Sequence, residues 1–281
     1  MQVRHFQPHQ ELRDWIAHYV YIDAAAEEAR QAFSFVPPNN MEGVQFYLEN
    51  RSSSSLTDFE KLMPRYYIGA QLTHPIRIRI PDRLKLIIAI FHRVRSTRLF
   101  RTPMRHFMDQ EVGLDKLYPQ LIRGFDEKIR EATEVEEKIR QIDNLFLQIA
   151  KQGSLDRSIV DYSVDQIYGV RGNIRVKSLV KELNTTHKTL ETHFKEQLGL
   201  SPKQYIDVAR VNFVLSQLKK LESYNVQDII GKTGFYDESH LIKHFKRLVN
   251  FTPKTLHGTR DFNEWFELPS FESLLLNTAT N

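Results

Sequence analysis

Two segments decide the fold of this chain: Asn184-Thr-Thr-His-Lys-Thr-Leu-Glu-Thr-His-Phe-Lys195 and Gly234-Phe-Tyr-Asp-Glu-Ser-His-Leu-Ile-Lys-His-Phe-Lys246. Each begins at a residue that suits a turn and continues with apolar residues at helical spacing. Each is then followed by a Ser-Pro or Thr-Pro pair, Ser201-Pro202 or Thr252-Pro253. Such a repeat is typical of two helix-turn-helix units, and the second helix of each unit enters a DNA major groove. The repeat therefore predicts a protein that offers two helices to successive grooves of one duplex.

Length and composition are those of an ordinary globular protein. A chain of 281 residues is longer than one hydrophobic core usually requires, so two domains are expected. It contains no cysteine, which excludes disulfides, thiolate zinc sites and cysteine nucleophiles. Charged residues interrupt the first twenty positions, and no apolar run reaches the length of a signal peptide or a membrane span. We expect a cytoplasmic protein that makes no membrane contact.

The basic residues are concentrated in the same part of the chain as the repeat. Residues 173–260 contain 15 Lys and Arg against 8 Asp and Glu, whereas the remainder contains 24 against 27. An excess of this kind is expected where a protein meets phosphates, but a solvated basic face without a partner would also show it. Charge alone therefore agrees with DNA binding without deciding it.

Residues 1–152 have the pattern of a mixed α+β domain. Short runs with strand character alternate with turn-forming segments, at 18–22, 43–48, 65–68, 75–80 and 84–91. In the fourth run, isoleucines alternate with arginines, so one face of that strand is apolar and the other is cationic. We expect a small antiparallel sheet accompanied by helices, with closure of the sheet into a barrel as one option.

A long helix is expected at 133–151, near the end of this domain. Its apolar residues are spaced by four, three, four and three positions, which places them in one stripe. The stripe is either the seam of a homodimer or the face on which the helix packs against its own domain. Residues 153–157 form the expected linker, 158–260 the second domain and 261–281 a C-terminal tail. The stripe consists of Val135, Ile139, Ile142, Phe146 and Ile149.

Local signals in the first unit predict two helices and the turn between them. Asn173 can cap a helix that runs to about residue 183, and Asn184 suits the positive φ that the turn needs. Thr186 can cap the second helix, whose inward positions recur every four residues. These inward positions are Leu190, Phe194 and Leu198.

A long helix is expected to separate the two units. Ser201, Pro202 and Gln204 combine an N-cap, a proline at the first helical position and a glutamine at the third. A helix of roughly twenty residues spans about 30 Å, which is close to the roughly 34 Å between major grooves on one face of DNA. The spacer therefore suits two helices that engage one duplex.

The second unit shows the same local signals as the first. Asn225 and Asp237 can cap its two helices, and Gly234 supplies the turn. His240 and His244 are spaced as two metal ligands would be, but no third ligand is near, so a packed His244 is the expectation. The inward positions of the second helix are Leu241, Phe245 and Leu248.

Several motifs within residues 158–260 occur together in a recognisable order. In the first half they are Leu179-Val180, Leu190, Phe194-Lys195, Gly199, Ser201-Pro202, Tyr205 and Arg210. In the second half they are Ile229, Gly234-Phe235, Asp237, Ser239, Phe245-Lys246, Thr252-Pro253 and Arg260. The set resembles the C-terminal domain of the AraC family of bacterial transcription regulators, from which Ile230, Asn250 and Leu256 depart. Residues 1–152 are more loosely similar to the sensor-like domain of some members.

The resemblance implies an all-α domain whose two recognition helices, at about 186–199 and 237–249, enter successive major grooves of double-stranded promoter DNA. Lysine can donate to guanine and glutamate can accept from cytosine, but the arginine that reads guanine most strongly is missing. DNA shape is therefore expected to contribute to sequence preference. The implied base-facing residues are Lys188, Glu191, Thr192, Ser239, His240 and Lys243. The implied phosphate contacts are His187, Lys195, Lys246 and Arg247.

Two groups in the first domain admit more than one interpretation. Its arginine cluster is an anion site, an auxiliary phosphate contact, or a solvated edge that discourages strand pairing. Its aromatic residues either line a ligand pocket or form the core. We expect the solvated edge and the core. The arginines are Arg93, Arg95, Arg98, Arg101 and Arg105, and the aromatic residues are Tyr19, Tyr21, Phe33, Phe35, Phe46, Tyr47, Tyr66 and Tyr67.

The whole pattern predicts a one-component transcription regulator of the bacterial nucleoid. A signal of unknown identity, either a small molecule or a protein, would act on the first domain and change whether both helices can engage neighbouring grooves. RNA polymerase is a further candidate partner. The alternatives are a first domain that only binds a protein partner and one that has an enzymatic activity. The sequence shows no catalytic, cofactor or metal site, so no enzyme is expected.

Overall fold

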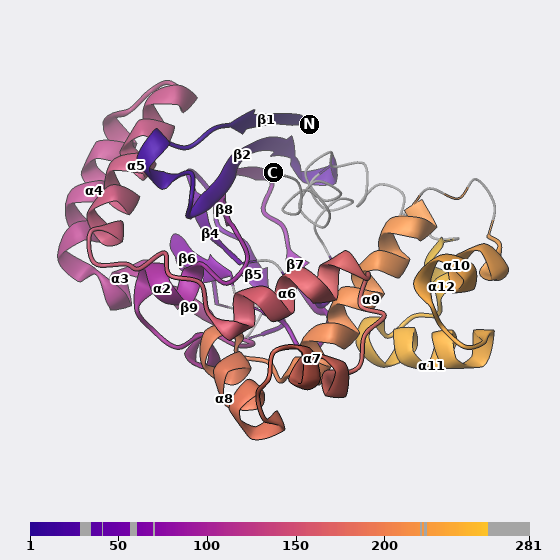
Figure 1. Ribbon diagram of the computed structural model, residues 1–281. Coiled ribbons are helices and arrows are strands. Elements are labelled where there is room, and N and C mark those ends of the chain that lie inside the picture. Colours follow the sequence, from indigo (N-terminus) through magenta and orange to yellow (C-terminus); the bar gives the residue numbers. More distant parts are fainter. Residues whose placement is uncertain are drawn as a thin grey trace.

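The computed structural model describes residues 1–28, 35–40, 42–56, 61–69, 71–219, 221 and 224–257. Within these residues, the first part of the chain is an antiparallel sheet with helices and the second part contains helices only (Figure 1). This arrangement confirms the predicted fold class. Arg260 and the expected tail at 261–281 lie outside the described residues.

The main sheet is antiparallel and open. Its six described strands lie in the order β1 (Gln2–Phe6), β2 (Ile16–Ala25), β8 (Arg83–Phe91), β4 (Gly43–Tyr47), β6 (Tyr66–Gly69) and β9 (Glu111–Gly113). Closure into a barrel would require the two edge strands to pair with each other, and in the described residues β1 pairs with β2 alone and β9 with β6 alone. The barrel option is therefore wrong.

A second, smaller sheet lies beside the main one. Its three described strands are ordered β3 (Phe35–Val36), β7 (Ile76–Arg79) and β5 (Ser53–Ser54). Along β7, Ile76 is buried whereas Arg77 and Arg79 are exposed, which confirms the apolar and cationic faces expected from the alternating sequence.

Helices cover one face of the main sheet and complete its core. Phe46 from β4 and Phe91 from β8 meet Phe146 edge to face, with ring centroids 5.9 and 5.6 Å away. The aromatic residues of the first domain that the structure describes are largely buried in this core or in the core on the opposite face, as expected. The helices of this part are α2 (Ser96–Phe100), α3 (Leu114–Leu117), α4 (Pro119–Glu131) and α5 (Val135–Ala150), with short 3-10 turns at Gln10–Leu12 and Met104–His106.

The apolar stripe of α5 belongs to this core. Ile139, Ile142, Phe146 and Ile149 are all buried among the sheet and helix residues of their own domain, and Val135 packs against them. The stripe is therefore not available as a dimer seam, and the interpretation that α5 packs on its own domain agrees with the structure. For two copies to pair along this stripe, α5 would first have to leave the sheet and expose the core beneath it.

Seven helices build the second part of the described chain. They are α6 (Ile159–Gly169), α7 (Val176–Glu182), α8 (His187–Leu198), α9 (Pro202–Lys219), α10 (Val226–Thr233), α11 (Glu238–Val249) and α12 (Pro253–His257). Helices α7 and α8 form the first helix-turn-helix unit, α10 and α11 form the second, and α9 joins them (Figure 1).

Most of the predicted helix caps are present. The side chains of Thr186, Asn225 and Asp237 accept hydrogen bonds from the first turns of α8, α10 and α11. At the start of α9, the Ser201 amide donates to Gln204 at 2.9 Å and the Gln204 amide donates back at 3.3 Å, which is a capping box. Asn173 is the exception, because α7 begins at Val176.

We predict that Ile142→Asp unfolds the protein rather than dissociating a dimer. Ile142 is 0% exposed, so the new carboxylate would be buried without a partner at a cost of several kcal/mol. Urea denaturation should show a large loss of stability, whereas Gln148→Asp on the exposed face of α5 should change it by less than about 0.5 kcal/mol. A folded Ile142→Asp monomer would contradict this account.

Candidate nucleic-acid interface

Each of the two recognition helices buries one face and exposes the other. Leu190, Phe194 and Leu198 of α8 are completely buried in the core of the first unit. In α11, Leu241 and Phe245 are completely buried, and Val249 takes the third buried position while the predicted Leu248 is half-buried. Because the apolar stripe of each helix is in use, the opposite polar face is free for a partner.

The structure places every predicted DNA-contacting residue on these exposed faces. Two of the predicted phosphate contacts already have ion-pair partners: Lys195 lies 2.6 Å from Glu191, and Arg247 lies 2.7 Å from Asp207. The Lys195–Glu191 pair is solvent-exposed, so it contributes little stability. The exposed residues are Lys188, Glu191, Thr192, Ser239, His240 and Lys243, together with His187, Lys195, Lys246 and Arg247.

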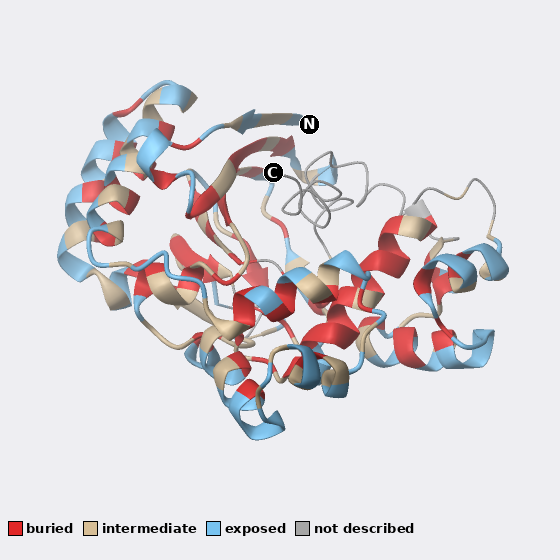
Figure 2. Cartoon of the chain, viewed as in Figure 1, coloured by how far each residue is buried: buried red, intermediate tan, exposed pale blue. Residues whose placement is uncertain are grey.

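Figure 2 shows α8 at the lower edge of the molecule and α11 at its lower right, each with exposed turns. Helix α9 separates them, and its 18 residues correspond to a length of about 27 Å. Tyr205, Ile206 and Ala209 near its beginning belong to the core of the first unit. Val214 and Leu218 further along belong to the core of the second. One helix therefore fixes the position of both units.

Asp207 ties α11 to this helix. Its carboxylate accepts from Lys203 at 2.5 Å and from Arg247 at 2.7 Å, and His244 Nε2 lies 3.0 Å from its Oδ1. Burial raises the pKa of Asp207, but hydrogen bonds from His244 and Lys203 outweigh burial and lower it to about 2. His244 is buried against Phe235 and Asp207, as a packed histidine was expected to be.

Three arginines of the cluster in the first domain, Arg93, Arg95 and Arg98, lie in an interface and do not form the expected solvated edge, whereas Arg101 and Arg105 are exposed. Arg98 from α2 donates to Asp161 of α6, with one bond of 3.2 Å, and to Ser158 at 3.0 Å. Arg95 lies 3.8 Å from the same carboxylate, and the guanidinium of Arg93 stacks on Tyr168 at 3.4 Å. These arginines hold the first unit against the sheet domain, a role that no sequence-based interpretation had named.

Further contacts complete this interface. Thr97 of α2 donates to the Gln197 carbonyl at 2.5 Å, and Asn40 donates to the Tyr205 carbonyl at 3.2 Å. Gly199 ends α8 at φ +78°, and a Cβ there would lie 2.5 Å from Met108 of the first domain. The C-terminal end of α8 is thus covered, whereas its N-terminal turns remain exposed.

A buried carboxyl group supports the helix that carries these contacts. Glu42 accepts from the side-chain hydroxyl and the backbone amide of Ser96 and from Gln71 at 3.4 Å. It thereby caps α2, whose own N-cap residue makes no side-chain bond. Burial raises the pKa of Glu42 to about 7 in spite of these hydrogen bonds.

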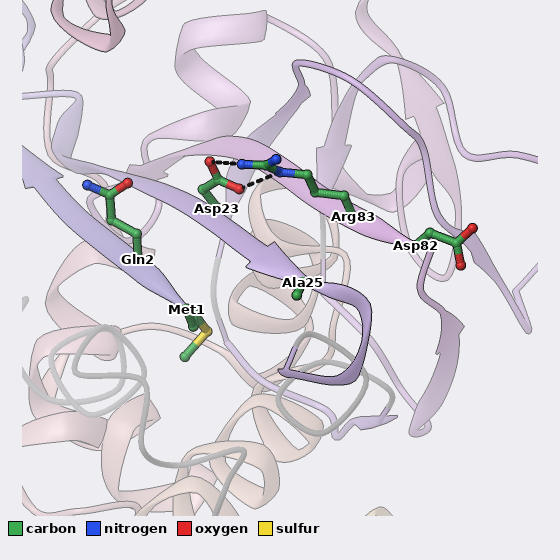
Figure 3. A pocket seen from close by; sticks show the side chains of 6 residues that line it. All are labelled: Met1, Gln2, Asp23, Ala25, Asp82 and Arg83. Atoms are coloured by element: carbon green, nitrogen blue, oxygen red, sulfur yellow. Dashed lines mark hydrogen bonds and ion pairs between the residues drawn. The ribbon is translucent and has the colours of Figure 1, made fainter.

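Two hollows open on the surface of the first domain. One, of about 520 Å³, is lined by Met1, Gln2, Asp23, Ala25, Asp82 and Arg83, and in it Arg83 is paired to Asp23 by two hydrogen bonds of 2.9 Å (Figure 3). The other, of about 410 Å³, is lined by Arg51, Pro64, Arg65, Tyr66, Asp115, Pro119, Ile122, Arg123 and Asp126. Both linings mix arginine with carboxylates, so neither by itself identifies a ligand.

The part of the chain that the structure describes contains no group of three His, Asp or Glu side chains that could hold a metal ion. Nor is any described helix both long and apolar enough to cross a membrane.

Comparison with known proteins agrees with this geometry. Residues 179–258 match a family model described as a helix-turn-helix domain, and residues 4–113 match one described as a domain of unknown function. The fold and the first match define a DNA-binding domain of the tandem helix-turn-helix class. Through that domain the chain is similar to transcriptional regulators of the AraC family.

Curated relatives match over part of this chain. The HTH-type transcriptional activator RhaS of Escherichia coli strain SE11 is 29% identical over 84 residues, which are 30% of this chain and 30% of the relative. RhaS of Escherichia coli strain K12 / DH10B is also 29% identical over 84 residues, with the same coverage. The match thus spans under a third of the length of these relatives.

Among solved structures, ToxT from Vibrio cholerae in its P21 crystal form is 12% identical, with 85% of this chain and 97% of that chain covered and a TM-score of 0.43. The AraC-like transcriptional activator CuxR is 15% identical, with 69% and 72% covered and a TM-score of 0.24.

Replacing Asp207 should loosen the second recognition helix. Folding lowers the pKa of the Asp207 carboxyl group from 3.8 to about 2, so the charged carboxylate stabilises the fold at pH values above about 4. This stabilisation is lost as the pH falls from about 4 to 2. Asp207→Asn should therefore cost about 2 kcal/mol at pH 7, and the difference from wild type should vanish near pH 2. Chemical denaturation across this range measures it, with Glu182→Gln as an exposed control. A pH-independent difference would show that the charge of Asp207 is not involved.

Proposed function

We propose that the protein is a sequence-specific DNA-binding transcription regulator whose helices α8 and α11 enter successive major grooves of one duplex. The observation that carries the proposal is that both helices bury their apolar faces and leave a polar face exposed. A single helix, α9, holds them at a separation that suits neighbouring grooves. The excess of basic residues in this part supports the same conclusion.

Within each helix, the exposed residues divide by their chemistry. Lys188 and Lys243 are donors for guanine edges, Glu191 is an acceptor for cytosine, and Thr192, Ser239 and His240 are adaptable contacts. His187, Lys195, Lys246 and Arg247 are suited to phosphates. Arg247 would keep its bond to Asp207 while one of its remaining N–H groups points to DNA, because a guanidinium carries five donors.

The first domain would control this activity through the interface built on α2. Arg98 and Thr97 hold the first unit, and β3 reaches the second unit through Phe35, whose ring lies 5.5 Å from that of Phe251. A small molecule or a protein that binds the first domain would shift the equilibrium between arrangements in which both helices can and cannot engage DNA. The hollow that contains three arginines offers one place for an anionic signal.

The remaining expectations are part of the same proposal. Helix α5 ends at Ala150 and α6 begins after Ser158, so we place the linker at 153–157 and the domains at 1–152 and 158–260. The protein would act in the cytoplasm on nucleoid DNA, would engage RNA polymerase at promoters, and would need no catalytic chemistry. A homodimer would have to use a surface other than the α5 stripe.

The double variant Lys188→Ala with Lys243→Ala tests the DNA-binding face. Each lysine should contribute about 1–3 kcal/mol, so affinity should fall about 30-fold or more, and the dependence on salt should become shallower. Fluorescence anisotropy with a duplex selected by the wild type from a random library measures both effects.

The control for this double variant is Lys116→Ala with Lys128→Ala, which removes the same charge from exposed positions of the first domain. It should bind the duplex as the wild type does. Unchanged binding by the Lys188 and Lys243 variant would show that DNA meets another surface.

Arg98→Ala tests the interface. It leaves the buried Asp161 with Arg95 as its nearest cation, at 3.8 Å, and removing one partner of a buried pair costs about 3–5 kcal/mol. The domains should separate more often, and trypsin should cut faster at the exposed Lys151, just before the linker, and at the exposed Arg157 within it. Arg105→Ala, which removes an exposed arginine 4.0 Å from Glu196, should leave the rate unchanged. Equal rates for both variants would mean that Arg98 does not hold the domains together.

A further inference from the structure

One side chain next to the second recognition helix is exposed far more than any other large apolar residue of the described chain. Tyr236 is 90% exposed, and the next such residue, Leu62, is 56% exposed. Single apolar residues on a surface are common, so exposure alone does not indicate a partner. The position of Tyr236 is what sets it apart, since it directly precedes Asp237, the N-cap of α11.

The two units of this chain provide an internal comparison. In the first unit, one residue separates Asn184, at φ +46°, from the N-cap Thr186. In the second, two residues separate Gly234, at φ +66°, from the N-cap Asp237. The second turn is therefore longer by one residue.

The additional residue is Tyr236 and not its neighbour. Phe235 is buried in the core of the second unit, where its ring lies 5.4 Å from that of His244. Tyr236 fills no such space, and the first unit makes its turn without a counterpart. Neither packing nor turn geometry thus accounts for a tyrosine at this position.

In a helix-turn-helix unit, the start of the recognition helix reaches the bases while the preceding helix crosses the sugar-phosphate backbone, so the turn between them lies near the backbone. A tyrosine there presents a neutral hydroxyl donor, and tyrosine is among the side chains that contact phosphate oxygens. Building on the proposed function, we propose that Tyr236 donates a hydrogen bond to a backbone phosphate at the edge of the groove that α11 enters. It positions the second helix without reading sequence.

Tyr236→Phe removes the hydroxyl and keeps the ring. Affinity should fall about five- to tenfold, by the same factor on a duplex selected by the wild type and on a random-sequence duplex of equal length. The slope of log affinity against log salt should stay that of the wild type, because a neutral donor releases no counterion. Tyr162→Phe, at an exposed tyrosine of α6, is the matched control and should bind normally.

Fluorescence anisotropy at several salt concentrations separates the outcomes. Equal losses on both duplexes with an unchanged slope support the phosphate contact. An unchanged affinity overturns the proposal, and a loss confined to the selected duplex overturns it in favour of a base contact. If the wild type binds neither duplex, it is the proposed function that fails. The variant should fold normally because the position is almost fully exposed, and circular dichroism checks this.

Discussion

The second half of the structure depends on one helix that two hydrophobic cores share. The first turns of α9 pack with the first unit through Tyr205 and Ile206, and its later turns pack with the second through Val214 and Leu218. Helix α9 is buried on nearly all sides, so neither unit can leave it without exposing its own core. The spacing of the two recognition helices is therefore a consequence of packing and does not rely on a flexible connection.

This constraint leaves the sheet domain with a limited way to act on the pair. It contacts the first unit through α2, where Arg98 meets Asp161, and it reaches the second unit where Phe35 meets Phe251. The Arg98–Asp161 pair is largely buried. Such a pair contributes little net stability, whereas removing one of its two partners is strongly destabilising because the other charge stays buried. Such a pair suits an interface that must form in one specific arrangement and whose equilibrium between formed and separated states a signal would shift.

The sequence predicted what is decided within a few residues and failed where the partner is distant. The caps Thr186, Asn225 and Asp237 were predicted because each bonds an amide two or three residues away. Asn173 failed as a cap because its side-chain oxygen accepts from Arg210, which is 37 positions away. Arg98 was misjudged for the same reason, because a charged side chain looks solvated until its partner 63 residues later is placed beside it. The periodicity of the α5 stripe alone could not distinguish a dimer seam from a face packed on the core. The open sheet depends on which strands pair, and the sequence pattern of a single strand does not reveal its partner.

The exposed faces of α8 and α11 could be predicted from helical spacing, whereas their connection to the rest of the molecule could not. That connection begins at Glu42, which holds Ser96 at the start of α2, and passes directly to Thr97 and Arg98 in the same helical turn. These contacts join Glu42, through consecutive residues of one turn, to Gln197 and Asp161, so a displacement of the sheet near Glu42 would act on both. Because the first unit shares α9 with the second, the same displacement reaches both recognition helices. Under the proposed function, a signal on the first domain would therefore change how the pair meets DNA without touching the proposed contact face.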